Sequence, residues 1–168
     1  NLGMPASSQD AVNKYYADSI VTVDSIWKKN GGNIYFEDHN IGIHTTSPAS
    51  ALHLKGSFLI DDETGNLPDS GAGTRLMWIP SKRSFRAGSV NSTQWDSANI
   101  GNTSTAIGFN TKASGSFSIA LGNNAQSTGN TTIALGYNTQ ATKDYAFAAG
   151  NASKAIEQNA VAIGNNNT

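Results

Sequence analysis

Small and apolar residues recur with a fixed period of 14 over the last third of the chain. Cut after every fourteenth residue, the sequence gives five units without an insertion: 95–108, 109–122, 123–136, 137–150 and 151–164. Every unit ends in Ala-x-Gly, and mostly apolar residues flank the alanine. These structural repeat positions are Ala106, Ala120, Ala134, Ala148 and Ala162, with Gly108, Gly122, Gly136, Gly150 and Gly164. A strict period without insertions is typical of a solenoid.

A unit of this length is too short for a pair of helices, but it suffices for one coil of two short strands and two turns. Coils that stack by parallel strand pairing rise by about 4.8 Å each, so five coils span roughly 20–25 Å. Side chains alternate across a strand. We therefore expect Ile119 and Leu121 to fill the coil interior, and Ser118 and Ala120 to face outward. The closing glycines suit turns with positive φ, and Asn110, like its equivalents, also suits a tight turn.

The predicted coil has a thin core, because so few large side chains are available to fill it. Small solenoids of this kind offset the chain entropy with difficulty. An outward alanine stripe packs closely against a neighbouring surface, and a threefold arrangement of copies would close that contact. A monomeric solenoid is the alternative.

The first 94 residues lack the period and predict other elements. Residues 6–20 predict a short helix, because Ser7 and Asp10 have capping-box spacing and Val12, Tyr16 and Ile20 share one face. Such a helix is marginal alone and needs a partner. Copies of itself in a trimer and the strands that follow it are equally good candidates.

Short strands and turns are expected between residues 21 and 94. The Asn-Gly-Gly-Asn sequence at 30–33 predicts a hairpin turn, and residues 61–73 read as a polar loop. Strands are expected around 41–43, 51–55, 76–79 and 84–88. We divide the chain into a helical trimerising segment (1–25), a β-rich connector (26–94) and the repeat region (95–168).

The composition supports a β-rich chain with tight turns, and the charge indicates which classes of partner are not expected. The net charge is −1 and only 14% of residues are charged, so neither nucleic acid nor an anionic membrane is indicated as a partner. Hydrophobic residues make up 38% and glycines number 17, which suits stacked short strands. There is no cysteine, and no apolar run approaches a membrane span of about 18 residues. No signal peptide opens the chain, so we expect a fragment of a longer fibre.

Candidate chemistry is sparse. Three histidines (His39, His44 and His53) form no His-x-His pair, and the acidic residues from Asp61 to Asp69 do not follow a calcium-loop spacing. No nucleophile elbow or phosphate-binding loop is present in the sequence. We therefore expect no catalytic, cofactor-binding or metal-binding residues, no cofactor, and no enzyme. Two other classes of function stay open: a tailspike that cleaves polysaccharide and an ice-binding solenoid.

Aromatic residues stand at the start or in the middle of several units. They are Trp95, Phe109, Phe117, Tyr137 and Tyr145. Such residues could stack against sugars or fill gaps between subunits, and packing is favoured because burying an aromatic ring stabilises more than leaving it wet.

The Ala-x-Gly units of residues 95–168 resemble the head repeat of trimeric autotransporter adhesins of the YadA type. That resemblance implies a left-handed parallel β-roll with three chains side by side around an axis. The fourth and fifth units depart from it, because Lys143 and Glu157 stand where Gly101, Gly115 and Gly129 stand in the first three. The departure concerns the shape of one turn.

Two earlier segments resemble tail fibres of phages and related tail-like particles. They are residues 5–18 and residues 40–56, the second containing Gly42-Ile43-His44-Thr45-Thr46-Ser47-Pro48. The fold class expected is thus an all-β homotrimeric fibre with a short N-terminal helix, a β-rich connecting region and a C-terminal β-roll.

The function expected is a structural and adhesive segment of a receptor-binding fibre outside the cell. A phage or tail-like injection particle is favoured as its carrier, with a bacterial cell-surface adhesin as the alternative. Its partners would be two further copies, an unknown glycan or protein receptor, and other fibre or baseplate proteins, without membrane insertion of this segment.

Overall fold

The computed structural model describes residues 28–30, 33–35, 40–60 and 65–168. The chain divides into two compact units, Asn1–Leu59 and Ile60–Thr168. The predicted helix at 6–20 and the tail-fibre-like segment at 5–18 lie outside the described residues.

Two pairs of short strands form the described part of the first unit. Strands β1 (Lys28–Asn30) and β2 (Asn33–Tyr35) are antiparallel, with Asn30 opposite Asn33. This register confirms the predicted hairpin. Strands β3 (Ile41–Ile43) and β4 (Leu52–Leu54) lie where the sequence predicted strands, and they pair in parallel.

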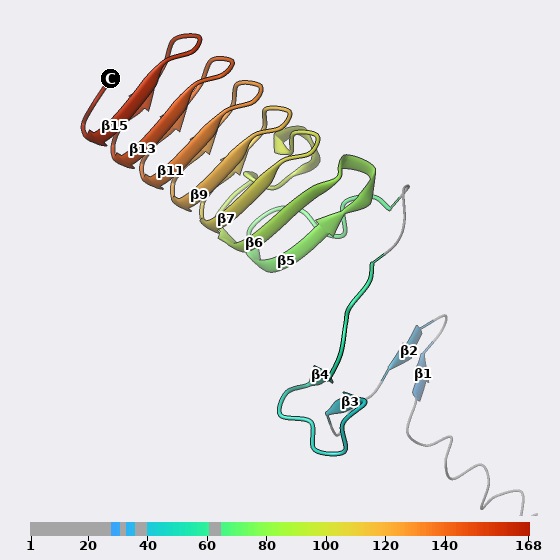
Figure 1. Ribbon diagram of the computed structural model, residues 1–168. Coiled ribbons are helices and arrows are strands. Elements are labelled where there is room, and N and C mark those ends of the chain that lie inside the picture. Colours follow the sequence, from blue (N-terminus) through green and yellow to red (C-terminus); the bar gives the residue numbers. More distant parts are fainter. Residues whose placement is uncertain (1–27, 31–32, 36–39, 61–64) are drawn as a thin grey trace, which may run out of the picture. The chain divides into compact units, whose positions relative to one another are not determined.

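The second unit is built on a seven-stranded sheet in the order β15-β13-β11-β9-β7-β6-β5 (Figure 1). Its strands are β5 (Gly73–Ile79), β6 (Ser84–Val90), β7 (Thr105–Phe109), β9 (Ile119–Asn123), β11 (Ile133–Tyr137), β13 (Phe147–Asn151) and β15 (Val161–Asn165). Only β5 and β6 are antiparallel to each other, and all other neighbours in this sheet are parallel.

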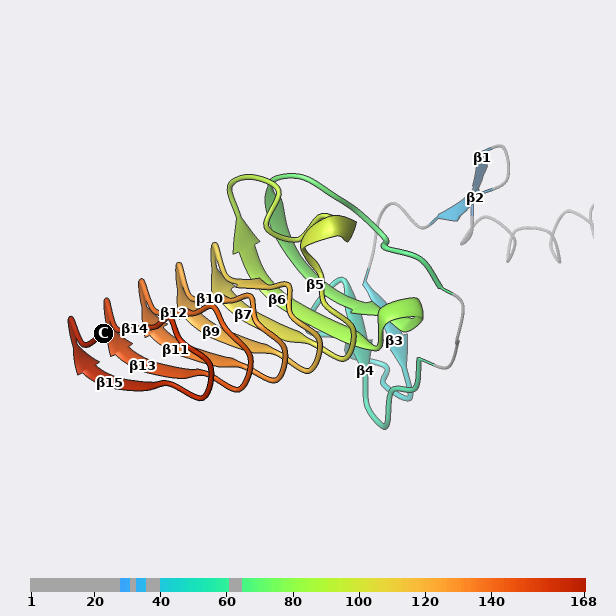
Figure 2. The same ribbon diagram turned by 90° about the horizontal axis from the view of Figure 1, so that it is seen from above.

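A second sheet of four two-residue strands follows the same stack, and Figure 2 shows three of them beside the long strands. They are β8 (Lys112–Ala113), β10 (Gln126–Ser127), β12 (Gln140–Ala141) and β14 (Lys154–Ala155). Each coil therefore has one long strand, one short strand and two turns, as the unit length predicted.

The register of the sheets confirms the predicted solenoid. Ala120 pairs with Ala134 and Ala134 with Ala148, so each coil lies on the equivalent residues of the next. In the short sheet Gln126 pairs with Gln140 in the same way. The fold is all-β, with a parallel β-solenoid that is consistent with a β-roll.

The predicted orientation of the strand side chains is wrong. The repeat alanines point into the coil, where Ala106, Ala120, Ala134 and Ala148 have no exposed surface. Four positions of the second to fifth units line the interior. Their residues are all Ala, Ser or Thr, and all but the partly buried Ala160 are at most 3% exposed. Two closely spaced sheets leave room for small side chains only. The branched residues therefore lie on the outside, where Ile107 is 40% exposed.

The closing glycines are required by the stacking of the coils. A Cβ added to Gly122 would lie 2.1 Å from the carbonyl oxygen of Gly136, and its φ is +125°. Gly108, Gly136 and Gly150 meet the next coil in the same way. No side chain fits such a contact, and an L-residue also disfavours this backbone conformation.

A more ordinary hydrophobic core fills the β5–β6 end of the solenoid. It contains Met77, Ile79, Val90, Trp95 and Ile100, all at most 5% exposed. The Trp95 indole Nε1 donates a hydrogen bond to the Thr111 carbonyl at 2.9 Å. Trp95 therefore packs inside its own chain and not, as predicted, between subunits. The 3₁₀ helix η3 (Ser97–Asn99) follows it in place of a short strand.

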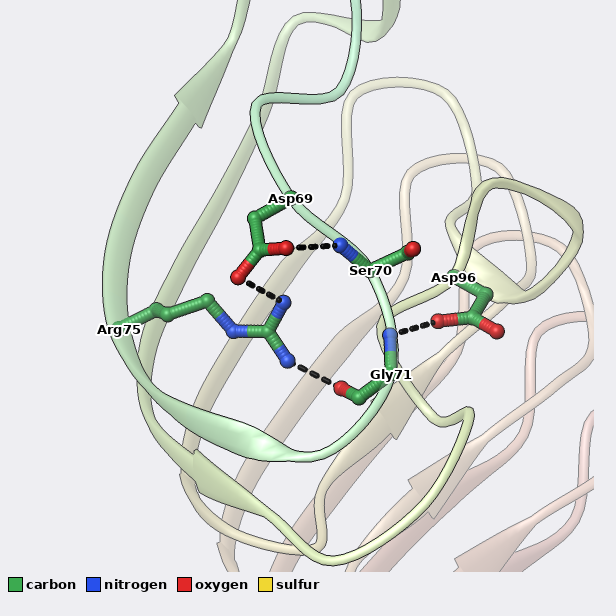
Figure 3. A network of polar contacts seen from close by, with 5 residues as sticks. All are labelled: Asp69, Ser70, Gly71, Arg75 and Asp96. Atoms are coloured by element: carbon green, nitrogen blue, oxygen red, sulfur yellow. Dashed lines mark hydrogen bonds and ion pairs between the residues drawn. The ribbon is translucent and has the colours of Figure 1, made fainter.

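A polar network ties the segment before β5 to the first coil (Figure 3). The Arg75 guanidinium lies 3.1 Å from the Asp69 carboxylate and also donates to the Gly71 carbonyl. The Gly71 N–H in turn donates to Asp96 Oδ1 at 2.6 Å. These contacts hold the segment against the end of the solenoid, and they give Asp69 a structural role.

Candidate functional site: an apolar sheet face and a polar groove

The outer face of the seven-stranded sheet is apolar over its whole length. Strand alternation places the buried residues inside, so their neighbours in sequence face outward. One column contains Trp78, Phe85, Thr105, Ile119, Ile133, Phe147 and Val161, and the next contains Leu76, Ala87, Ile107, Leu121, Leu135, Ala149 and Ile163. Neither column holds a charged residue. We call these two columns the apolar face.

Several side chains of the apolar face are far more exposed than is usual for their type. Leu76 is 74% exposed, Val161 68% and Ile163 58%. A large contiguous apolar surface with no charge marks a protein contact site. The sequence contained this signal, because every unit places branched or aromatic residues beside its alanine, but the predicted orientation assigned them to the interior.

A polar groove of about 430 Å³ lies on the short-strand sheet. Ala113, Ser127, Ala141 and Ala155 point from this sheet into the coil, so the residues before them face away from the interior. These outward residues are Lys112, Gln126, Gln140 and Lys154. The apolar face and the groove therefore look in opposite directions from the coil.

Asparagines at the turns before the first three short strands, and Ala152 before the fourth, form the second wall of the groove. Asn110, Asn124 and Asn138 have φ of 52–54°, a conformation that asparagine adopts more readily than most residues. The Asn124 N–H donates to the Phe109 carbonyl of the preceding coil at 2.8 Å, and Asn138 repeats the pattern at 2.9 Å. Backbone bonds thus hold the side chains in register from coil to coil.

The opposite turns carry exposed aromatic residues. Phe117 is 62% exposed and Tyr145 58%, both at positive φ. Phe109 and Tyr137 are also exposed in the single chain. Packing of these four rings against another subunit stays a prediction.

In the fourth and fifth units, the turns that contain Lys143 and Glu157 replace one hydrogen bond with another. In the glycine-containing units a hydroxyl donates to the glycine carbonyl, as Ser118 Oγ does to Gly115 at 2.6 Å. In the fourth unit alanine replaces the hydroxyl residue, and the Ala146 N–H donates to the Lys143 carbonyl at 3.2 Å. The fifth unit uses Ala160 and Glu157 likewise.

Histidines do not converge on a site in the described residues. His44 is exposed, and His53 Nδ1 accepts a hydrogen bond from the Ala49 N–H at 3.2 Å. His39, Asp61, Asp62 and Glu63 lie outside the described residues. Across 40–60 and 65–168, no three His, Cys, Asp or Glu side chains come together as metal ligands would.

One buried cation stands out at the end of the solenoid. Arg86 occupies the position that alanine takes in the next coil, and its guanidinium is fully buried. It donates to the Ser104 and Ala113 carbonyls at 2.9 and 3.0 Å, while Nε has no partner among the described residues. Burial lowers its pKa to about 10, so it stays charged at neutral pH. Arg86 closes the end of the coil interior.

Comparison with known proteins identifies the repeat. A family model described as "YadA head domain repeat (2 copies)" matches residues 100–125, 127–153 and 145–167. No curated protein matches the chain. No solved structure matches it either. Residues 100–167 therefore match the YadA head repeat, as the resemblance of the Ala-x-Gly units predicted.

Proposed function

We propose that this chain is a structural and adhesive segment of a homotrimeric fibre outside the cell. The apolar face is the single observation that carries this proposal. In each copy it would pack against the other two copies around a common axis, and the likeness to the YadA head repeat favours three copies over two. Cyclic symmetry closes such a contact and leaves no apolar face free.

Energetics support association along this face. The coil interior buries only small side chains, which contribute little, because the hydrophobic free energy scales with the apolar area removed from water at about 25 cal/mol per Å². The large side chains are outside. Burying them between copies would supply the stabilisation that the thin interior lacks. The predicted contact along the alanines is thus replaced by one along the branched residues beside them.

The adhesive role rests on multivalency. Three identical copies side by side present every surface site three times, which raises weak contacts to a useful avidity. The groove on the opposite side of each coil would face outward in such a trimer.

Two carriers of the fibre are considered. The match to the YadA head repeat supports a cell-surface adhesin of the trimeric autotransporter type. A phage or tail-like injection particle, with baseplate proteins as further partners, rests on the resemblance of residues 5–18 and 40–56 alone. In the described residues no helix is both long enough and apolar enough to cross a membrane.

A binding experiment that compares the unaltered chain with a variant designed to be monomeric tests the proposal. The chain and a Leu121→Lys/Leu135→Lys variant would be labelled and applied to arrays of bacterial glycans, host glycans and matrix proteins. We expect the unaltered chain to bind a subset of spots and the variant, which should be monomeric, to lose that binding. Equal binding by both would contradict adhesion through a multivalent trimer. Release of reducing ends from a bound glycan would favour the tailspike instead.

A further inference from the structure

We propose that the polar groove on the short-strand sheet binds a linear polysaccharide that carries carboxylate groups, lying along the solenoid axis. The inference rests on the proposed adhesive function and names the ligand class and the site. Three observations carry it: the repetition of the groove from coil to coil, the chemistry of its walls and its charge.

The groove repeats the same side-chain positions in successive coils. Gln126 and Gln140 are paired residues of adjacent short strands, and Asn124 and Asn138 occupy equivalent positions in the turns before them. Parallel strands place equivalent positions about 4.8 Å apart. An extended chain of pyranose rings advances by a similar length per sugar, so the two middle coils would each meet one ring with the same pair of amides.

The walls of the groove offer donors and acceptors that the fold itself leaves free. Each amide can donate two hydrogen bonds and accept two, which matches the hydroxyl groups of a sugar ring. Within the described residues the Gln126, Gln140, Asn124 and Asn138 amides make no side-chain hydrogen bond, whereas Asn110 accepts one from the Asn91 N–H. Free amides in a concave surface are available to a ligand.

The positive charge of the groove favours an acidic polysaccharide over a neutral one. Lys112 and Lys154 line the two ends of the row, three coils or roughly 14 Å apart. No Asp or Glu is among the side chains that line the described groove. The two ammonium groups would therefore meet carboxylates of the ligand about three sugars apart. A neutral chain would leave both lysines without a partner.

The fold does not require these residue types at this position. The side chains face away from the coil interior, and strand propensity favours β-branched or aromatic residues over lysine in such a place. Lys, Gln, Gln and Lys in four successive coils thus give the groove its polarity without helping the solenoid to form.

The test uses the oligomeric chain and two hexasaccharides with the same linkage. A β-1,4-linked mannuronate hexamer is the acidic probe and a β-1,4-linked glucose hexamer is the neutral one, both titrated by calorimetry. We expect the acidic hexamer to bind and the neutral one to bind at least several-fold more weakly. Lys112→Gln/Lys154→Gln should weaken the acidic hexamer roughly tenfold, as two exposed ion pairs would. Lys143→Gln, on an exposed turn outside the groove, should leave it unchanged.

Several results would overturn the inference. The acidic hexamer would not bind, or Lys112→Gln/Lys154→Gln would leave its affinity unchanged, or the neutral hexamer would bind as tightly as the acidic one. A glutamate hexapeptide that binds as tightly as the acidic hexamer would make the groove a peptide site. A Gln126→Ala/Gln140→Ala variant adds an independent readout, because it should weaken binding without a change of charge. Light scattering on the same samples separates the two proposals: a trimer that ignores the sugar contradicts only the ligand, whereas a monomer contradicts the fibre.

Discussion

The two ends of the solenoid unit are stabilised in different ways. At the β5–β6 end, Met77, Ile79, Val90, Trp95 and Ile100 form a core of large side chains, as in most globular domains. In the coils that follow, alanine, serine and threonine fill the interior and the large side chains face outward. The first region is stabilised by the burial of these large side chains, whereas the second depends on backbone pairing and on burial of its outer face.

Because of this contrast, the two regions should respond in opposite ways to a change in side-chain volume. In the β5–β6 core, removing volume leaves a cavity, so deletions should be costly. In the coils the interior has no spare room, so additions should be costly instead. Paired substitutions test this distinction. Unfolding should be measured at one fixed chain concentration, since an oligomer's stability depends on concentration.

Trp95→Ala should have the largest effect. The ring is fully buried and its indole N–H is hydrogen-bonded, so we expect a loss of about 3–5 kcal/mol in the free energy of unfolding. Denaturant titration followed by circular dichroism measures it. Gln158→Ala, on an exposed turn, should change stability by less than about 0.5 kcal/mol. Equal effects of the two substitutions would contradict a core centred on Trp95.

Gly122→Ala tests the stacking of the coils. Its Cβ would meet the Gly136 carbonyl, whereas Gly164→Ala at a nearly equal φ of +123° would meet only the Asn167 side chain. The backbone strain is therefore common to both variants. We expect Gly122→Ala to cost about 1–3 kcal/mol more than Gly164→Ala. Thermal unfolding of both variants gives the difference, and equal melting temperatures would refute the contact.

Ala134→Val tests the narrow interior. Two added methyl groups have no space between the two sheets, so a loss of about 1–3 kcal/mol is expected. The matched control is Ala149→Val in the next coil, which points outward from the apolar face and should cost much less. Chemical denaturation measures both. A greater loss from Ala149→Val would restore the orientation that alternation alone predicted.

Thr139→Val should have the smallest effect and the opposite sign. Thr139 Oγ1 is buried without a partner among the described residues, while Thr132 Oγ1 donates to the Gly129 carbonyl at 2.6 Å. Removing an unsatisfied hydroxyl should stabilise by about 1 kcal/mol, and Thr132→Val should destabilise by a similar amount. Differential scanning calorimetry can resolve the two signs. Destabilisation by both would show that Thr139 does have a partner.

The sequence was sufficient to predict the solenoid and its 14-residue register. The closing glycines have the predicted positive φ, but they lie within the long strands, and the turn comes two residues later, as at Asn110. A fixed spacing of Ala120, Ala134 and Ala148 determines which residues pair when coils stack, whatever their side chains do. The hairpin around residues 30–33 and the strands at 41–43 and 76–79 were also predicted correctly, because turn residues and apolar runs mark them directly.

The orientation of the strands could not be obtained from alternation, because alternation gives two faces without saying which is inside. The decisive signal was volume: four positions of the second to fifth units hold only Ala, Ser or Thr, and a narrow coil accepts nothing larger. The union of β5 and β6 with the repeat sheet was missed because both strands lie outside the period. The groove was missed because no single unit contains it.

The solution mass of residues 1–168 tests the central claim most directly. Light scattering after size exclusion should give three times the 17.6 kDa of one chain, because the apolar face must be covered. Leu121→Lys/Leu135→Lys should reduce the mass to that of one chain, whereas Gln158→Lys, on an exposed turn, should leave it unchanged. A folded, stable monomer of the unaltered chain would contradict the account.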